Sequence, residues 1–322
     1  MQAIVHQRFG APDRALALRE IEAPGLAAGA VRVRVRAAAV SKGDWLITTG
    51  LPYIARPAFG LLRPKQKVAG LELAGQVEAV GDAVTRFAPG DAVFGWGQGA
   101  FAEHASVPEG QLAAKPAGIS YAQAAALPVS GCTALQALRD PGALAAGDAV
   151  LIIGASGGVG SFAVQIAKAM GAEVTGVASA RNLPLLRRIG ADHVIDYRTE
   201  AITDSGRRYD LILDIAGNRP LAELRRALAP EGRAVMVGGS GSRATMGFER
   251  TIRGLLLSPF VGRALRSLFA QPNLEDLQAL AAWVESGALV PVVDRTFPLA
   301  EAATAVARVG AGHGHGKTVV AV

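Results

Sequence analysis

The fold of this chain is decided by the stretch Ala149-Val150-Leu151-Ile152-Ile153-Gly154-Ala155-Ser156-Gly157-Gly158-Val159-Gly160. Its first five residues are all apolar, which is typical of a buried strand in a parallel sheet. A glycine-rich turn follows, and residues 161–170 then place apolar side chains at helical spacing until Gly171 ends the helix. A strand, a glycine-rich turn and a helix in this order form a phosphate cradle, because the helix N-terminus offers free N–H groups. Since Ala155 replaces the first glycine of the G-x-G-x-x-G pattern, the loop alone also fits a tight turn that binds nothing.

Strands and helices alternate from about residue 121 to residue 240. This alternation with short loops predicts a parallel, doubly wound α/β sheet whose ligand lies at the carboxyl ends of the strands. The expected strands are 149–153, 173–178, 193–195, 210–215 and 233–237, and the expected helices are 161–170, 182–189 and 219–229.

Residues 1–118 are rich in strand patterns. Residues 30–37 alternate apolar and basic side chains, which indicates a strand with one wet face, and short turns such as Pro89-Gly90 separate further strands. These patterns predict a barrel-like β domain. The final strand, Thr318–Val322, is expected to rejoin it. We therefore predict a nucleotide-binding domain at residues 121–265, inserted into a β domain of residues 1–120 plus 266–322. Residues 241–270 are expected to form a mobile segment over the cleft.

Composition narrows the class of protein. The chain has 322 residues, of which 50% are hydrophobic and 19% charged, and its apolar runs are too short to span a bilayer. No signal-peptide pattern begins the chain, so we expect a cytoplasmic protein without a membrane partner. The single cysteine, Cys132, excludes an intrachain disulfide and a multi-cysteine metal site. The net charge of +6 comes from scattered residues, so no nucleic-acid partner is expected.

The residues after the second strand of the doubly wound sheet indicate which dinucleotide binds. An acidic side chain there selects NAD, because it accepts hydrogen bonds from the ribose and repels a 2′-phosphate. This chain has Ala178-Ser179-Ala180-Arg181-Asn182 at that place, without an acid. Arg181 and Ser179 are suited to a phosphate, and Tyr197 follows the third strand into the same region. The sequence therefore predicts NADPH as the cofactor.

Several motifs together resemble those of the medium-chain dehydrogenases/reductases, in particular the zinc-independent quinone oxidoreductase (zeta-crystallin-like) branch. The motifs are Ala74–Gly81, Pro89–Gly95, Gly131–Ala134, Gly154–Gly160 and Gly190–Tyr197, and the likeness covers essentially the whole length. The resemblance implies a Rossmann domain inserted into a GroES-like β-barrel domain, and a homodimer. It also implies that Thr133 and the Gly238-Gly239 turn position the nicotinamide. The full expected cofactor set is Thr133, Ser156, Gly157, Gly158, Val159, Gly160, Ser179, Arg181, Tyr197, Gly238 and Gly239.

The same resemblance addresses zinc. Zinc-dependent relatives take ligands from a Cys-x-x-Asp segment, from Gly-His-Glu and from a cysteine four residues before the family threonine. The matching positions in this chain are Ser41, Leu71 and Val129, and none of them carries a competent ligand side chain. We therefore expect no zinc, and Cys132 is interpreted as a small core or pocket residue.

A zinc-free site favours an acceptor that needs little activation, so we expect hydride transfer from NADPH to a quinone or an α,β-unsaturated carbonyl. The candidate catalytic residues are Ser41, Lys42, Asp44 and Thr133, and Trp45 and Tyr53 are expected to line the substrate pocket. Water or the Ser41 hydroxyl would protonate the product. Asp44 and Glu72 also fit structural hydrogen-bonding roles, and Lys42 also fits a solvated surface lysine.

Two other functions remain compatible with the sequence. One is a different enzyme of the same fold, a zinc-free NAD(P)-dependent alcohol dehydrogenase or an enoyl-thioester reductase with a basic entrance at Arg243, Arg250 and Arg253. The other is a non-catalytic sensor that binds NADPH, because fold alone does not establish catalysis.

Overall fold

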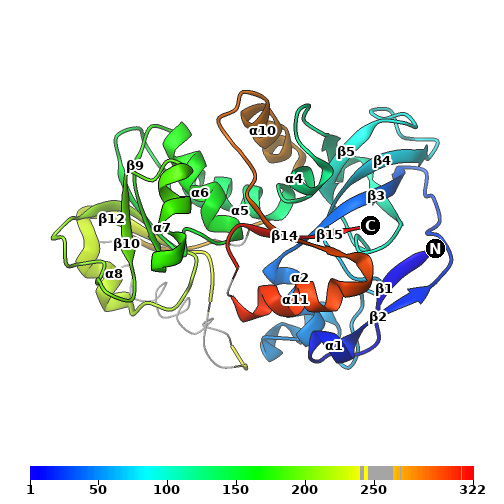
Figure 1. The fold of residues 1–322 in the computed structure, drawn as a ribbon, viewed down its shortest axis with the longest axis horizontal. Helices are drawn as coiled ribbons and strands as arrows, with labels where there is room; N and C mark the ends of the chain where they lie inside the picture. Colours follow the sequence, from blue (N-terminus) through cyan, green and yellow to red (C-terminus); the bar gives the residue numbers. More distant parts are fainter. Residues whose placement is uncertain (240–242, 246–263, 269, 313) are drawn as a thin grey trace. The chain divides into compact units, whose positions relative to one another are not determined.

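The computed structural model describes residues 1–239, 243–245, 264–268, 270–312 and 314–322, which group into two units (Figure 1). The first unit comprises residues 1–132, 272–287 and 291–322, and the second comprises residues 133–271 and 288–290. The sequence-based boundaries lie after residues 120 and 265. The segment expected to be mobile, residues 241–270, lies mostly outside the described residues.

The second unit is built on a six-stranded sheet in which every pairing is parallel. The strand order β10-β9-β8-β11-β12-β13 reverses direction at β8, which is the switch point where doubly wound folds bind their ligands. This confirms the predicted doubly wound sheet. The strands are β8 (Ala149–Ile153), β9 (Glu173–Ala178), β10 (His193–Asp196), β11 (Tyr209–Asp214), β12 (Leu228–Met236) and β13 (Ala264–Ser267).

Helices cover this sheet because its central strands are apolar on both faces. Leu151 and Ile153 of β8 pack with Val177, Ile212 and other fully buried side chains into one core cluster. The helices are α6 (Gly158–Ala169), α7 (Leu183–Arg188) and α8 (Leu221–Ala227), and the 3₁₀ turn η3 (Ala180–Asn182) lies between β9 and α7. Helix α5 (Pro128–Arg139) begins in the first unit and continues into the second.

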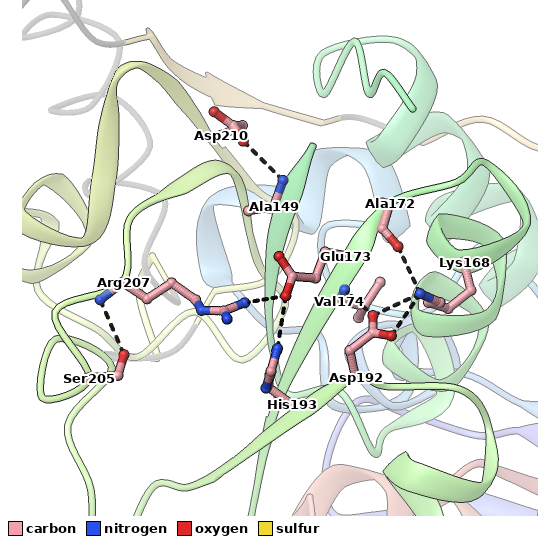
Figure 2. Close-up of polar contacts among 10 residues, drawn as sticks. All are labelled: Ala149, Lys168, Ala172, Glu173, Val174, Asp192, His193, Ser205, Arg207 and Asp210. Carbon is pink, nitrogen blue, oxygen red and sulfur yellow. Dashed lines mark hydrogen bonds and ion pairs between the residues drawn. The ribbon is translucent and has the colours of Figure 1, made fainter. Parts of the chain in front are cut away.

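Polar side chains connect the amino ends of the strands in the second unit (Figure 2). Lys168 Nζ lies 2.8 Å from Asp192 Oδ2 and also donates to the carbonyl of Ala172. Glu173 accepts from Arg207 at 2.8 Å and contacts His193 at 2.9 Å. A further contact joins Asp210 to the Ala149 N–H, and Ser205 accepts from the Arg207 N–H. These contacts lie at the edge of the sheet opposite the glycine-rich turn, which follows the carboxyl end of β8.

The first unit contains a seven-stranded mixed sheet and a separate two-stranded ribbon. Strand β3 is its centre, since it pairs with β4, β6 and β15. The pairing of β3 with β15 confirms that the last strand rejoins the β domain. The strands are β1 (Gln2–His6), β2 (Leu16–Glu20), β3 (Ala30–Val40), β4 (Glu72–Val80), β5 (Ala92–Trp96), β6 (His104–Pro108), β7 (Leu112–Ala114), β14 (Val293–Pro298) and β15 (Lys317–Ala321).

The alternation in β3 has the predicted consequence. Val31, Val33 and Val35 are buried in the core cluster of this unit, whereas Arg34 and Arg36 are exposed. The helices of the unit are α1 (Pro12–Ala15), α2 (Lys42–Thr49), α3 (Arg56–Phe59), α4 (Tyr121–Ala125), α10 (Leu274–Glu285) and α11 (Ala302–Ala311), with short 3₁₀ turns at Tyr53–Ala55, Glu109–Gln111 and Leu299–Glu301. Among the described residues, no helix has the length and hydropathy that crossing a bilayer requires.

Candidate functional site

The turn between β8 and α6 has the backbone geometry of a phosphate-binding loop. Gly154 has φ +86°, and a Cβ at Gly160 would collide with the backbone of Gly154 and Ala155, so glycine is required for the helix to pack on the turn. At Gly157 an added Cβ would lie 3.5 Å from the Gly154 carbonyl oxygen, which is an ordinary van der Waals contact, so a side chain would fit there without a clash. No side chain caps the N-terminus of α6, which leaves its first N–H groups available to an anion.

A buried hydrogen bond joins this turn to the segment after β9. Asn182 Nδ2 donates to Ser156 Oγ at 3.0 Å, and both residues are buried. Ser179, which follows β9 directly, is also buried, whereas Arg181 is exposed. The link brings the predicted 2′-phosphate residues and the glycine turn to one corner of the second unit. Sequence reasoning did not assign a role to Asn182, because a helix-starting asparagine normally caps its own helix.

The ends of β11 and β12 lie against each other. Buried Asp214 accepts a hydrogen bond from the Gly217 N–H at 2.9 Å, and its carbonyl accepts from the Gly238 N–H at 3.3 Å. A Cβ on Gly217 would meet the backbone of Gly238, and a Cβ on Gly238 would collide with the Ile215 carbonyl. Close backbone approach therefore explains both glycines, including the first position of the predicted Gly238-Gly239 turn. The sequence analysis assigned no role to Asp214 or Gly217. The only feature of the sequence that pointed to them was an acidic residue at the end of a buried strand.

The predicted cofactor residues other than Thr133 thus lie along one edge of the sheet in the second unit. They follow the carboxyl ends of β8, β9, β10 and β12, strands of one parallel sheet. Tyr197 follows β10 and is 48% exposed. Thr133 is part of the second unit, on helix α5.

The predicted catalytic residues Ser41, Lys42 and Asp44 lie together where α2 begins. Ser41 is the N-cap, and both its N–H and its hydroxyl donate to Asp44 Oδ2 at 2.7 Å. Both residues are buried, and Asp44 Oδ1 has no hydrogen-bond partner within the described part of the chain. Burial raises the pKa of Asp44 to about 6, against the lowering effects of the Ser41 hydrogen bonds and the charge of Lys317. The Ser41 hydroxyl is therefore directed at Asp44.

The surroundings of Lys42, Trp45 and Tyr53 differ from those of the buried Ser41–Asp44 pair. Lys42 Nζ donates to the Gly310 carbonyl at 3.1 Å and lies 4.0 Å from the centre of the Trp45 ring. A lysine on the last carbonyls of α11 complements the negative end of that helix dipole. Tyr53 lies in the 3₁₀ turn after α2, is 48% exposed and stacks with Arg56. The roles predicted for these three residues stay predictions.

A second buried polar cluster joins β4, β15 and the start of α5. Lys317 Nζ contacts Glu72 Oε1 and Ser130 Oγ, and Glu72 Oε2 accepts from the Val129 N–H at 2.9 Å. Glu72, Ser130 and Lys317 are each less than 5% exposed. Burial raises the pKa of Glu72 to about 7, although the charge of Lys317 and hydrogen bonds from Lys317 and Val129 lower it. Lys317 and Ser130 were missed, because a lysine before a strand reads from sequence as a surface residue.

The positions that hold zinc in zinc-dependent relatives do not fit that metal in this chain. The Ser41 hydroxyl donates to Asp44, Leu71 offers no donor atom, and the Val129 N–H is bound by Glu72. Within the described ranges, no group of three or more His, Cys, Asp or Glu side chains is placed to hold a metal ion.

Comparisons with known proteins agree with this architecture. The family model for the alcohol dehydrogenase GroES-like domain matches residues 27–117, and that for zinc-binding dehydrogenases matches residues 189–320. The chain is 31% identical over 333 residues to the chloroplast envelope quinone oxidoreductase homolog of Arabidopsis thaliana, covering 99% of this chain and 98% of the relative. It is 34% identical over 281 residues to the mitochondrial NAD(P)H oxidoreductase RTN4IP1 of Bos taurus, covering 79% and 70%. The solved quinone oxidoreductase from Coxiella burnetii matches with a TM-score of 0.87 and 29% identity, over 100% of this chain and 99% of that one. A GroES-like domain, a Rossmann-type sheet and full-length similarity together establish that the chain belongs to the quinone oxidoreductases of the medium-chain dehydrogenase/reductase superfamily.

Proposed function

We propose that this oxidoreductase transfers hydride from NADPH to a quinone or an α,β-unsaturated carbonyl compound without zinc. The observation that carries the proposal is the corner formed by the glycine turn and the segment after β9. There the Asn182–Ser156 hydrogen bond joins a phosphate cradle to a segment that holds Arg181 and no acid. An arginine at this place, where NAD-selective folds carry an acidic side chain, favours the 2′-phosphate of NADPH over the free ribose hydroxyl of NADH.

Each part of the cofactor has residues to hold it. The first N–H groups of α6 and the turn Ser156–Gly160 would bind the pyrophosphate. Ser179, Arg181 and Tyr197 would surround the 2′-phosphate, and Thr133, Gly238 and Gly239 would orient the nicotinamide. When bound, NADPH supplies the hydride. The name NAD(P)H oxidoreductase of the Bos taurus relative supports a nicotinamide cofactor.

The residues at the family zinc positions favour an acceptor that accepts hydride without Lewis-acid help. Quinones and enones qualify, because the negative charge spreads over a conjugated system as the hydride adds. The quinone oxidoreductase relatives support this class. When the Asp44 carboxyl is ionised, the Ser41 hydroxyl donates its proton in a hydrogen bond to that carboxylate and does not offer it to a substrate. We therefore propose solvent water as the source of the product's proton at neutral pH.

The test is steady-state oxidation of NADPH and of NADH with a panel of quinones, enones, alcohols and an enoyl thioester, before and after EDTA treatment. We expect turnover with quinones or enones, faster with NADPH and unchanged by EDTA. Arg181→Ala should raise the KM for NADPH by about tenfold, through loss of a charge-assisted contact, and leave the KM for NADH unchanged. Arg187→Ala, which removes an exposed arginine six residues further along the chain, in α7, is the matched control.

The outcomes separate the alternatives. Activity abolished by EDTA would overturn the zinc-free reading. Preference for the enoyl thioester or an alcohol would reassign the substrate class. Tight NADPH binding without turnover of any acceptor would favour the sensor over the enzyme.

A further inference from the structure

Two adjacent leucines stand out on the surface of the first unit. Leu61 is 69% exposed and Leu62 is 89% exposed. Of the six large hydrophobic side chains that are exposed within the described residues, four lie between residues 53 and 62. Single exposed apolar residues are ordinary, but consecutive leucines at this exposure mark a surface built for contact.

The segment that carries them is a closed loop, defined here as the leucine loop, residues 59–65. The Lys65 N–H donates to the Phe59 carbonyl at 2.8 Å, and Lys65 Nζ donates to the Pro57 carbonyl at 3.1 Å. Gly60 has φ +122°, and an added Cβ there would collide with the Arg63 carbonyl. The backbone is therefore folded on itself, with the two leucines held at its tip.

Basic residues precede and follow this tip in the sequence. From Trp45 to Leu71 the chain contains no aspartate or glutamate. The same stretch contains Arg56, Arg63, Lys65 and Lys67, the last three of them exposed. Neither the Arg63 nor the Lys67 side chain makes a hydrogen bond or ion pair with another described residue. Their charges are available to a partner.

We propose that the leucine loop docks on the surface of an anionic lipid bilayer. Apolar side chains at a loop tip suit the boundary between headgroups and acyl chains, while flanking cations suit anionic headgroups. The expectation of no membrane partner concerned segments that cross a bilayer, whereas a loop that lies on the surface needs no spanning helix.

The charge pattern argues against a second copy of this chain as the occupant. A two-fold contact through the loop would bring the same cations face to face, in a protein whose net charge is already +6. An acidic protein would also pair with the cations, but two leucines that are 69% and 89% exposed suit an apolar layer better than a polar protein surface. The proposal is independent of the hydride-transfer reaction.

The test is co-sedimentation of the full chain with phosphatidylcholine vesicles, with and without phosphatidylglycerol, at low and high salt. We expect binding to the anionic vesicles and little binding to pure phosphatidylcholine. Leu61→Ser with Leu62→Ser, and separately Arg63→Glu with Lys67→Glu, should each weaken binding by about tenfold or more. The matched control is Arg187→Glu with Arg188→Glu, which makes the same charge change on exposed arginines of the second unit and should alter binding less than about threefold.

Three results would overturn the proposal. One is no binding to anionic vesicles by the wild type while its circular dichroism shows a folded protein. Another is equal loss in both charge-reversal variants, which would indicate attraction by net charge alone. The third is full binding by the leucine variant together with equal binding of the wild type to soluble polyglutamate, which would indicate an acidic protein partner.

Discussion

An added methyl group should affect stability at one glycine of the turn and cofactor binding at another. Gly160→Ala places a Cβ against the backbone of Gly154 and Ala155, which cannot move aside cheaply, so it should cost about 1–3 kcal/mol of stability. Gly157 has φ −78°, and an added Cβ there would make only an ordinary van der Waals contact, so Gly157→Ala should leave the unfolding temperature almost unchanged. Its methyl group would instead occupy the space proposed for the pyrophosphate and weaken NADPH binding. Thermal unfolding and titration calorimetry distinguish the two effects, and equal loss of stability in both variants would contradict this account.

Two aspartates should show opposite dependence on pH. Asp44 has a pKa of about 6 in the folded protein, against 3.8 for an ordinary aspartate, so the folded state keeps a proton that the unfolded chain releases between these values. Its contribution to stability therefore falls as pH rises from about 4 to 6 and stays lower above that. Asp44→Asn keeps an acceptor for Ser41 but does not ionise. The free energy of unfolding of this variant, minus that of the wild type, should therefore be larger at pH 8 than at pH 4.

For Asp192 the contribution to stability should change with pH in the opposite direction. Burial raises the pKa of its carboxyl, but the hydrogen bonds from Lys168 and the Val174 N–H and the charge of Lys168 outweigh this, so the pKa is lowered. Its stabilising contribution is present above the ordinary pKa and disappears as pH falls through the lowered value. Asp192→Asn should thus be less stable than the wild type at pH 7, by under about 1 kcal/mol because the pair is partly exposed, and should match it in strong acid. Urea unfolding followed by circular dichroism tests both aspartates; the same sign for both would refute the assignment.

At the scale of elements, the start of α5 depends on a buried ion pair. Glu72 binds the Val129 N–H of that helix, while Lys317 compensates the charge of Glu72. Lys317→Met leaves the carboxylate uncompensated and should cost about 3–5 kcal/mol. Replacing Glu72 by Gln as well removes the stranded charge, so the double variant should be more stable than Lys317→Met alone. Urea titration of the four proteins measures the coupling, and additive losses would show that the pair does not act as a unit.

The elements that sequence predicted best are those whose signal is local. A few consecutive residues were enough to indicate the secondary structure and burial of these elements. They are the apolar run of β8, the glycine turn after it and the alternating Val and Arg of β3. Helix α2 was not predicted, although Ser41-Lys42-Gly43-Asp44 has the spacing of a capping box, because these residues were interpreted only as ligand, catalytic or hydrogen-bonding positions. The Glu72–Lys317 pair joins residues 245 positions apart, and no local pattern indicates such a partner. The site was therefore predictable at its loops and not in its buried polar contacts.

At the scale of the whole molecule, the distribution of tryptophan makes the two units separately observable. Trp45, Trp96 and Trp283, the only tryptophans of the chain, all belong to the first unit. The residues proposed to bind NADPH all belong to the second unit, which has its own apolar core. A ligand that binds only the folded form stabilises the unit that holds it, by about 2.7 kcal/mol at a hundred times its Kd.

We therefore expect NADPH to separate two unfolding transitions. With the cofactor in excess, tryptophan fluorescence should report loss of the first unit at a lower urea concentration than far-ultraviolet circular dichroism, which also follows the helices of the second. Arg181→Ala should reduce that separation, whereas Arg187→Ala should preserve it. Coincident transitions at every NADPH concentration would instead mean that α5, which runs from one unit into the other, makes them a single cooperative structure.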